Sequence, residues 1–221
     1  MKLHGGVVVG RRWEDQPDSA LDHRDVGRVA ERLMGRKHQL VPRKEIDGDH
    51  GRFSVKWTQE GLRRSIRVAD DLHAYDVRRV LGHESGHLID YVARIPTRGL
   101  EKELGLIYDS LIKERKAAGE AWRPQDRGYT DEQAPFEYMA EAINMYKANP
   151  NTMKTMAPET AARIRSYVNE NPYLRNVIQF NGKILPYAAP VGMGYQQFAK
   201  PDDGKSAAAG GTFGRLYEVG R

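Results

Sequence analysis

Hydrophobic and polar residues follow two different periods along the chain, and the change of period separates strands from helices. From Arg52 to Trp57 the residues alternate, with Phe53, Val55 and Trp57 on one face, which predicts a half-buried β-strand. Short apolar or β-branched runs predict three further strands, at Val7–Trp13, Gln39–Val41 and Ser65–Ala69. The predicted strands therefore gather early in the chain.

Five segments follow the 3.6-residue period of an amphipathic helix. The first has typical ends, because Asp22 can cap its N-terminus and Gly35 can end it. Most of the later ones end before a proline, which cannot continue a helix. The predicted helices run from after Asp22 to Met34, from about Tyr75 to before Pro96, from Leu100 to Ala118, from Glu132 to Lys147, and from after Pro158 to before Asn171.

The C-terminal part predicts a hairpin and then a tail. Val177–Phe180 and Lys183–Tyr187 flank Asn181-Gly182, a pair that suits a type I′ turn. Beyond Ala188 the chain is rich in Gly, Ala, Ser and charged residues, which is typical of a flexible segment. We therefore expect one α+β domain over residues 1–187, with strands early and helices late, and a flexible tail over 188–221.

Composition narrows the chemistry more than it indicates a partner. The 221 residues include no cysteine, which excludes disulfide frameworks, cysteine-ligated zinc fingers and thiol nucleophiles. Histidines and carboxylates remain as ligands for a transition metal. The 35 basic and 30 acidic residues give a net charge of +5, which permits an anionic partner without indicating one, and nucleic acid is not expected.

No targeting segment is recognisable in the sequence. No stretch reaches the roughly 20 apolar residues of a membrane span. The apolar patch at Val7–Val9 is too short for the core of a signal peptide. We expect a cytoplasmic protein unless a separate system exports or delivers it.

The helix that begins near Tyr75 contains His83-Glu84-Ser85-Gly86-His87, an HExxH motif. Residues four apart return to the same helix face, so both imidazoles can bind one ion. Glu84 lies beside that face, where its carboxylate can take a proton from a metal-bound water. Gly86 costs about 1 kcal/mol relative to alanine in a helix, which suggests close packing at this point.

A catalytic zinc site needs a third protein ligand. The residues after His87 lack the glycine and histidine of a metzincin, which excludes that pattern. The other solution is a glutamate on a second helix, and Phe136–Ala142 places Glu137 and Glu141 four apart among small alanines. Glu137 is the predicted ligand and Glu141 the residue that holds the free nitrogen of a ligand histidine, with the reverse assignment open.

These residues resemble the lethal-factor-type gluzincins, which include the catalytic domain of anthrax lethal factor and the Pro-Pro endopeptidases. The resemblance rests on HExGHxxD at residues 83–90, ExxAEA at residues 137–142 and the segment Met156–Thr160, and it covers about residues 65–170. It implies a zincin-like fold, with a small mixed sheet packed on the active-site helix and a mainly helical second half. It also implies one Zn²⁺ ion bound by His83, His87 and Glu137.

The resemblance implies roles for two further residues. The family places a tyrosine shortly before the ligand glutamate, with its hydroxyl toward the oxyanion, and Tyr129 matches. Asp90 also matches the family pattern and is expected to make a supporting hydrogen bond. With Glu84 as general base, the implied activity is hydrolysis of peptide bonds in a protein or peptide substrate.

Two other functions stay open. One is a non-proteolytic metal-binding interaction module of a mobile element or virus. The other is nucleic-acid binding through a basic patch made of Arg63, Arg64, Arg67, Arg78 and Arg79. For an endopeptidase, a substrate strand could add beside Arg52–Trp57 or beside Ser65–Ala69.

Overall fold

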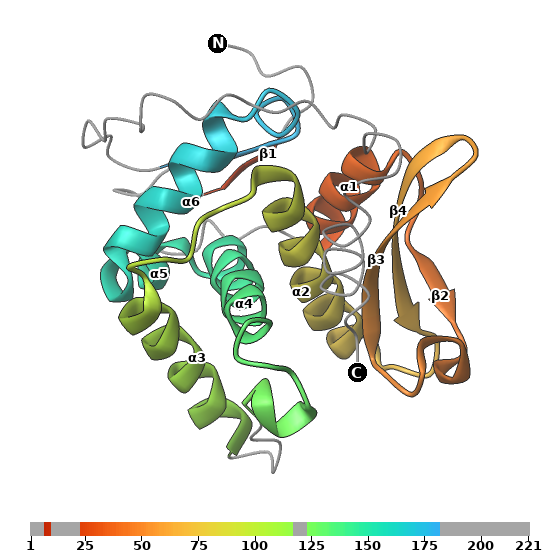
Figure 1. Ribbon diagram of the computed structural model, residues 1–221, viewed down its shortest axis with the longest axis horizontal. Helices are drawn as coiled ribbons and strands as arrows, with labels where there is room; N and C mark the ends of the chain where they lie inside the picture. The colour runs from red at the N-terminus through yellow and green to blue at the C-terminus, as the bar shows by residue number, and fades with distance from the viewer. Residues whose placement is uncertain (1–6, 10–22, 117–122, 182–221) are drawn as a thin grey trace, which may run out of the picture.

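The computed structural model describes residues 7–9, 23–116 and 123–181 (Figure 1). Several predictions fall outside these residues. They are the strand beyond Val9, the cap at Asp22, the last two residues of the helix predicted to Ala118, the hairpin strand Lys183–Tyr187 and the tail 188–221.

The chain is α+β, with a small mixed sheet of three strands. The strands are β2 (Gln39–Val41), β3 (Gly51–Thr58) and β4 (Gly61–Ala69). β4 is central, antiparallel to β3 and parallel to β2. All three predicted strands are confirmed, but β4 begins four residues before Ser65. Its first half has no clear alternation, because Arg64 stands on the face that also carries Leu62 and Ile66.

A second sheet joins segments far apart in the sequence. β1 (Val7–Val9) pairs in parallel with β5 (Ile178–Phe180), with Val7 opposite Ile178. The local turn signal at Asn181-Gly182 predicts only a neighbouring partner for β5, and that predicted partner lies outside the described residues. The parallel pairing could not be predicted, since it depends on how the intervening domain folds.

The described residues form six α-helices. They are α1 (His23–Met34), α2 (Ala74–Ala93), α3 (Glu101–Lys116), α4 (Ala134–Ala148), α5 (Pro150–Met156) and α6 (Pro158–Glu170). Two 3₁₀ turns, η1 (Arg43–Ile46) and η2 (Gln125–Arg127), precede β3 and α4. The sequence does not predict the short helix α5, because Asn149-Pro150 indicates only the end of the preceding helix. Asn149 instead caps α5, its side chain accepting from Thr152 N–H at 3.3 Å, and Pro150 takes the first helical position.

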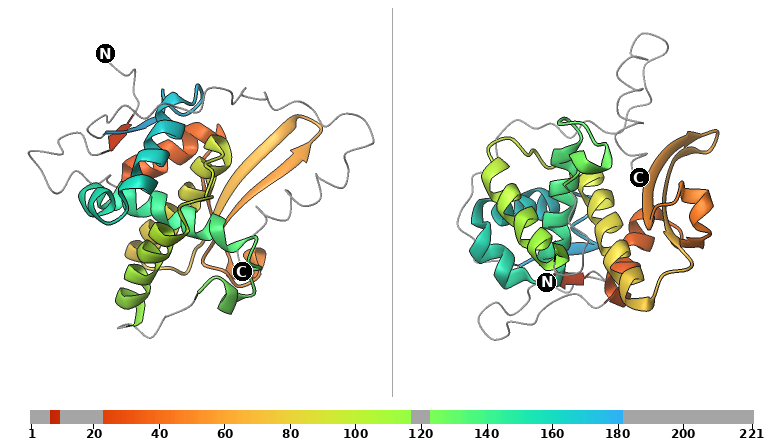
Figure 2. Two further views of the ribbon diagram at one scale, coloured as in Figure 1. Left: turned by 60° about the vertical axis from the view of Figure 1, so that its left-hand side comes forward. Right: turned by 90° about the horizontal axis from the view of Figure 1, so that it is seen from below.

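Helix α2 lies between the three-stranded sheet and the helices α3 to α6 (Figures 1 and 2). The sheet and α1 pack on one side of α2, and α4 packs on the other, with α3, α5 and α6 on the same side as α4. Phe53, Ile66, Leu88, Ile89 and Ile143 are each at most 1 % exposed. The middle of α2 is therefore surrounded by protein, which excludes water from most of this helix. Within the described residues, no helix combines the length and the apolar character that crossing a membrane requires.

Candidate metal centre

The backbones of α2 and α4 approach closely at Gly86. A Cβ atom at this position would lie 2.5 Å from the backbone oxygen of Ala140, whereas ordinary contact begins at 3.4 Å. Only glycine fits, and this is the physical reason for a helix-destabilising residue inside the HExxH motif. The close approach places the first turns of α4 beside the imidazoles of α2.

Three potential ligands converge at this crossing. The Nε2 atoms of His83 and His87 lie 3.0 Å apart. The Glu137 carboxylate reaches both, with Oε2 at 3.3 Å from His83 Nε2 and Oε1 at 3.2 Å from His87 Nε2. One ligand atom from each residue falls within 4.8 Å of the others, so this group could hold a metal ion.

A proton or a metal cation must lie between the two imidazole Nε2 atoms. When both rings are neutral and carry their proton on Nδ1, their Nε2 lone pairs face each other across 3.0 Å. Either a proton or a metal cation removes this repulsion. The donor set of two imidazoles and one carboxylate is typical of a transition-metal site.

The electrostatics agree with a site built for a cation. Burial alone lowers the pKa of His83, but the charges of Glu141 and Glu137 outweigh it and raise that pKa well above its ordinary value. Burial alone raises the pKa of Glu137, yet His87 and His83 bring it far below the ordinary value. The carboxylate is thus stabilised in its ionised form, as a metal ligand must be.

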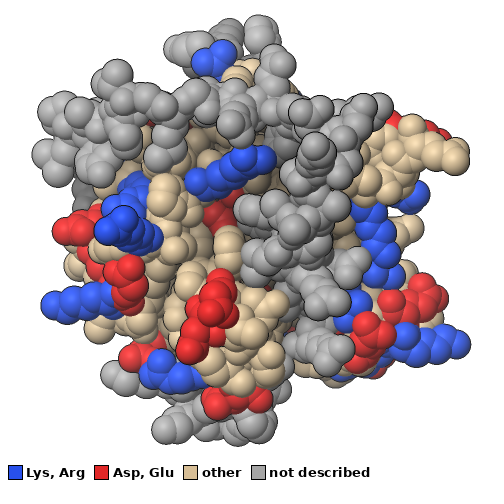
Figure 3. Space-filling view, viewed as in Figure 1, with Lys and Arg blue, Asp and Glu red and all other residues tan. Residues whose placement is uncertain are grey.

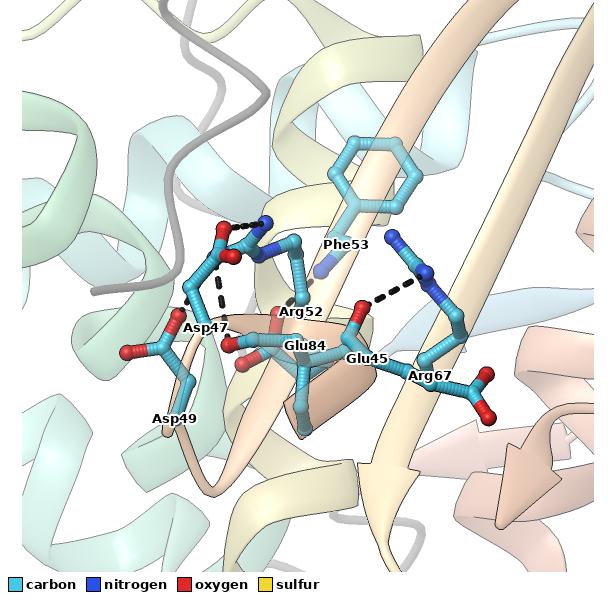
Figure 4. Close-up of polar contacts among 8 residues, drawn as sticks. Glu45, Asp47, Asp49, Arg52, Phe53, Arg67 and Glu84 are labelled. Carbon is cyan, nitrogen blue, oxygen red and sulfur yellow. Dashed lines mark hydrogen bonds and ion pairs between the residues drawn. The ribbon is translucent and has the colours of Figure 1, made fainter. Parts of the chain in front are cut away.

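Glu84 lies beside this group, between α2 and the start of β3 (Figure 4). It is 5 % exposed, and its Oε2 accepts a hydrogen bond from the backbone N–H of Phe53 at 2.6 Å. Burial raises the pKa of its carboxyl group. A carboxyl group with a raised pKa, close to a potential metal position, holds a proton more readily than an ordinary glutamate and can accept and return one.

The start of β3 is held against α2 by its own contacts. Arg52 donates hydrogen bonds to Asp47 and Asp49, each at 2.8 Å, and so anchors the turn before the strand (Figure 4). A Cβ atom at Gly51 would lie 2.2 Å from Val80 Cγ1 and 3.0 Å from Glu84 Oε1. Glycine at this position therefore lets the strand approach the carboxylate.

The two glutamates of α4 occupy different positions around His83. Glu137 contacts the Nε2 atoms, as described above, whereas Glu141 Oε1 lies 3.3 Å from His83 Nδ1. Asp90 is also buried, and its Oδ1 accepts from the backbone N–H of Ile95 at 3.3 Å. Burial raises the pKa of Asp90 to about 7. The geometry thus separates the predicted ligand from the two predicted supporting carboxylates.

Tyr129 lies in the segment between η2 and α4. Its side chain is half-buried, and its backbone N–H donates to the carbonyl oxygen of Pro124 at 3.2 Å. The role of its hydroxyl stays a prediction.

Lys147 is a polar residue of this region that sequence reasoning missed. It is 2 % exposed, and its Nζ donates to Gly82 O at 2.7 Å and to Ser85 Oγ at 2.5 Å. Burial lowers its pKa to about 7. It lies ten residues after Glu137, about 80° away around α4, so helical spacing alone does not indicate it.

Of the five arginines of the basic patch considered from the sequence, Arg63 and Arg78 are exposed and the other three make contacts within the protein. Arg64 donates to Leu33 O at 3.3 Å and lies over the ring of Tyr91, and Arg67 donates to Glu45 O at 3.0 Å. Arg79 lies 3.9 Å from Asp76. On the face seen in Figure 3, basic and acidic side chains are interspersed. Much of this positive charge therefore serves contacts within the protein.

Fold and site together define an α+β protein with a candidate His–His–Glu metal centre between two crossing helices. Comparison of the chain with protein-family models, with curated proteins and with solved structures finds no match. Arguments about function therefore depend on the site itself.

Proposed function

We propose that this protein is a zinc-dependent endopeptidase of the gluzincin type, with a zincin-like fold. The observation that carries the proposal is the convergence of His83, His87 and Glu137 with the Glu84 carboxylate beside them. Two imidazoles and one carboxylate are a ligand set of catalytic zinc sites, which keep a fourth position open for water. The absence of cysteine in the chain agrees with this choice of ligands.

His83, His87 and Glu137 would hold the ion. When bound, zinc supplies a Lewis acid and lowers the pKa of water at the open position to about 7. Glu84 would take the proton of the attacking water and pass it to the amine that leaves. The raised pKa of Glu84 supports both halves of this proton transfer. In this proposal, Tyr129 donates its hydroxyl to the developing oxyanion, and Glu141 and Asp90 hold the ligand helix and its imidazoles in place.

Strand β3 is the proposed binding edge for a peptide substrate. β4 is flanked by β2 and β3 at Arg67 and Val68, while the other edge of β3 lies toward α2, where the Phe53 N–H donates to Glu84. The Phe53 N–H points to Glu84, and alternate residues of an antiparallel strand share that direction. Val55 and Trp57 therefore turn their backbone groups to the same edge, where an extended peptide can pair. Of the two strands considered from the sequence, this geometry favours Arg52–Trp57.

A zinc determination combined with a peptide-library cleavage profile tests the proposal. Wild type should contain about one zinc per chain, and Glu84→Gln should keep the zinc while losing about 100-fold or more of the cleavage rate, because it loses the general base. Glu60→Gln, in the exposed turn between β3 and β4, is the matched control and should cleave like wild type.

Two outcomes would refute the peptidase. One is a wild-type protein that binds zinc but cleaves no peptide in the library, which is the result expected for a metal-binding interaction module. The other is cleavage that persists unchanged in Glu84→Gln.

A further inference from the structure

Polar residues continue beyond the metal ligand along the face of α4 that packs on α2. Glu137, Glu141 and Asn144 are separated by four and then three residues, so they lie on one helix face. The face opposite them carries His83 and, one residue earlier, Gly82. The α2–α4 contact is therefore polar for about two turns from the metal ligands.

Asn144 contacts the carboxylate that faces His83. Its Nδ2 donates to Glu141 Oε2 at 3.3 Å. The other oxygen of the same carboxylate, Oε1, lies 3.3 Å from His83 Nδ1. The amide and the imidazole thus approach different oxygens of one buried group, which restricts how that group can rotate.

Gly82 leaves the space that the Asn144 amide occupies. A Cβ atom at Gly82 would lie 2.4 Å from Asn144 Oδ1 and 3.3 Å from its Cγ. The obstacle is the end of a flexible side chain, so a methyl group here displaces the amide. At Gly86, by contrast, the obstacle is the backbone of Ala140, and a methyl group there displaces the helix.

The helix itself is restrained at the level of Gly82. Lys147 Nζ donates to the Gly82 carbonyl oxygen at 2.7 Å, and Ser85 Oγ donates to the same oxygen at 2.8 Å. Asn144 is only half-buried, so its displaced amide can reach water. A substitution at Gly82 therefore moves the Asn144 side chain and leaves the packing of α2 on α4 in place.

We propose that Asn144 is a positioning residue of the metal centre. It orients the Glu141 carboxylate against His83 Nδ1, which in turn directs His83 Nε2 toward the ion, and Gly82 provides the space that this contact needs. The inference rests on the proposed function in one respect only, the binding of a metal by His83, His87 and Glu137. Loss of an outer partner of a metal ligand typically lowers metal affinity about 10- to 100-fold. Asn144 acts through Glu141, so we expect about 10-fold, the lower end of that range.

Competition with a chromogenic chelator measures zinc affinity in wild type, Asn144→Ala, Gly82→Ala and the double variant. Each single variant should bind zinc about 10-fold more weakly, as for other outer partners. The double variant should bind no more weakly than the weaker single variant, since both changes remove the same contact. Gly105→Ala is the matched control, because a Cβ atom at this helical glycine of α3 meets nothing within 4 Å, and it should bind zinc like wild type.

Thermal unfolding of the metal-free proteins separates positioning from a structural role. Gly82→Ala replaces a helical glycine with a better helix former, so its unfolding temperature should not fall. Lower zinc affinity without lower stability is the expected combination. The proposal is overturned if either single variant binds zinc like wild type, or if the two losses multiply in the double variant.

These measurements do not depend on catalysis. A wild-type protein that binds zinc and cleaves nothing refutes the peptidase, while the affinity series still decides the role of Asn144. A wild-type protein that binds no zinc overturns both.

Discussion

Replacing Gly86 with alanine tests whether the helix crossing creates the metal centre. The added Cβ would lie 2.5 Å from Ala140 O, and 3.1 Å from the carbonyl carbon and the Cα atom of the same residue. To restore ordinary contact at 3.4 Å, the two backbones must separate by about 1 Å, because packed interiors leave no void to absorb the methyl group. Metal–ligand distances tolerate deviations of only about 0.2 Å. Glu137 moves with α4, so it should no longer reach an ion held by the two imidazoles.

The substitution should lower zinc affinity much more than it lowers the stability of the fold. Overpacking of a core costs about 1–3 kcal/mol, and the gain in helix propensity on replacing glycine offsets about 1 kcal/mol of it. Gly86→Ala should therefore remain folded by circular dichroism, with a modestly lower unfolding temperature. Its zinc affinity, measured by chelator competition, should fall about 100-fold or more, since one of three ligands is withdrawn. Zinc binding within about threefold of wild type, with Gly105→Ala as control, would refute the reasoning.

Two further predictions concern pH and the strand beside Glu84. The raised pKa of His83 means that protons compete with the metal at pH values above 6.5, so zinc affinity should decrease as the pH falls through this range. Glu141→Gln removes the largest charge that raises this pKa and should shift the decrease to lower pH, and an unchanged pH profile in the zinc titration would contradict the assignment. In Gly51→Ala the new Cβ would lie 2.2 Å from Val80 Cγ1 and 3.0 Å from Glu84 Oε1, so the start of β3 should move away from α2 and the Glu84 carboxylate should shift. Peptide cleavage should slow about 10-fold or more while zinc affinity stays near that of wild type. Zinc affinity that falls in parallel with cleavage would show that β3 supports the ligands rather than the proton transfer.

The local elements could be predicted because each depends on neighbouring residues. Periodicity indicated the helices around the HExxH motif and around Glu137, and strict alternation indicated β3. Where the local pattern was ambiguous, the sequence predicted an element too short or did not predict it. The arginine at position 64 interrupts the hydrophobic pattern in the first half of β4. Pro150, which by its residue type indicates the end of a helix, is the first residue of α5.

Contacts between distant residues account for what was missed at the site. The Phe53 N–H that reaches Glu84 comes from 31 positions earlier, and the Lys147 amine that reaches Gly82 comes from 65 positions later. No spacing rule within one element reports such contacts, because they depend on how the sheet and α4 pack on α2. The pairing of β1 with β5 is of the same kind.

The sequence by itself determined which chemical groups this protein can offer a metal, since the absence of cysteine and the four-residue spacing of His83 and His87 depend only on composition and helix geometry. It also favoured Glu137 over Glu141 as the ligand, with the reverse assignment left open. Tertiary structure alone decided that Glu137 faces the Nε2 atoms and that Glu141 faces Nδ1, because the crossing at Gly86 sets the height of one helix against the other. Packing between the helices, and not the order of residues within one helix, fixes which carboxylate meets which imidazole nitrogen.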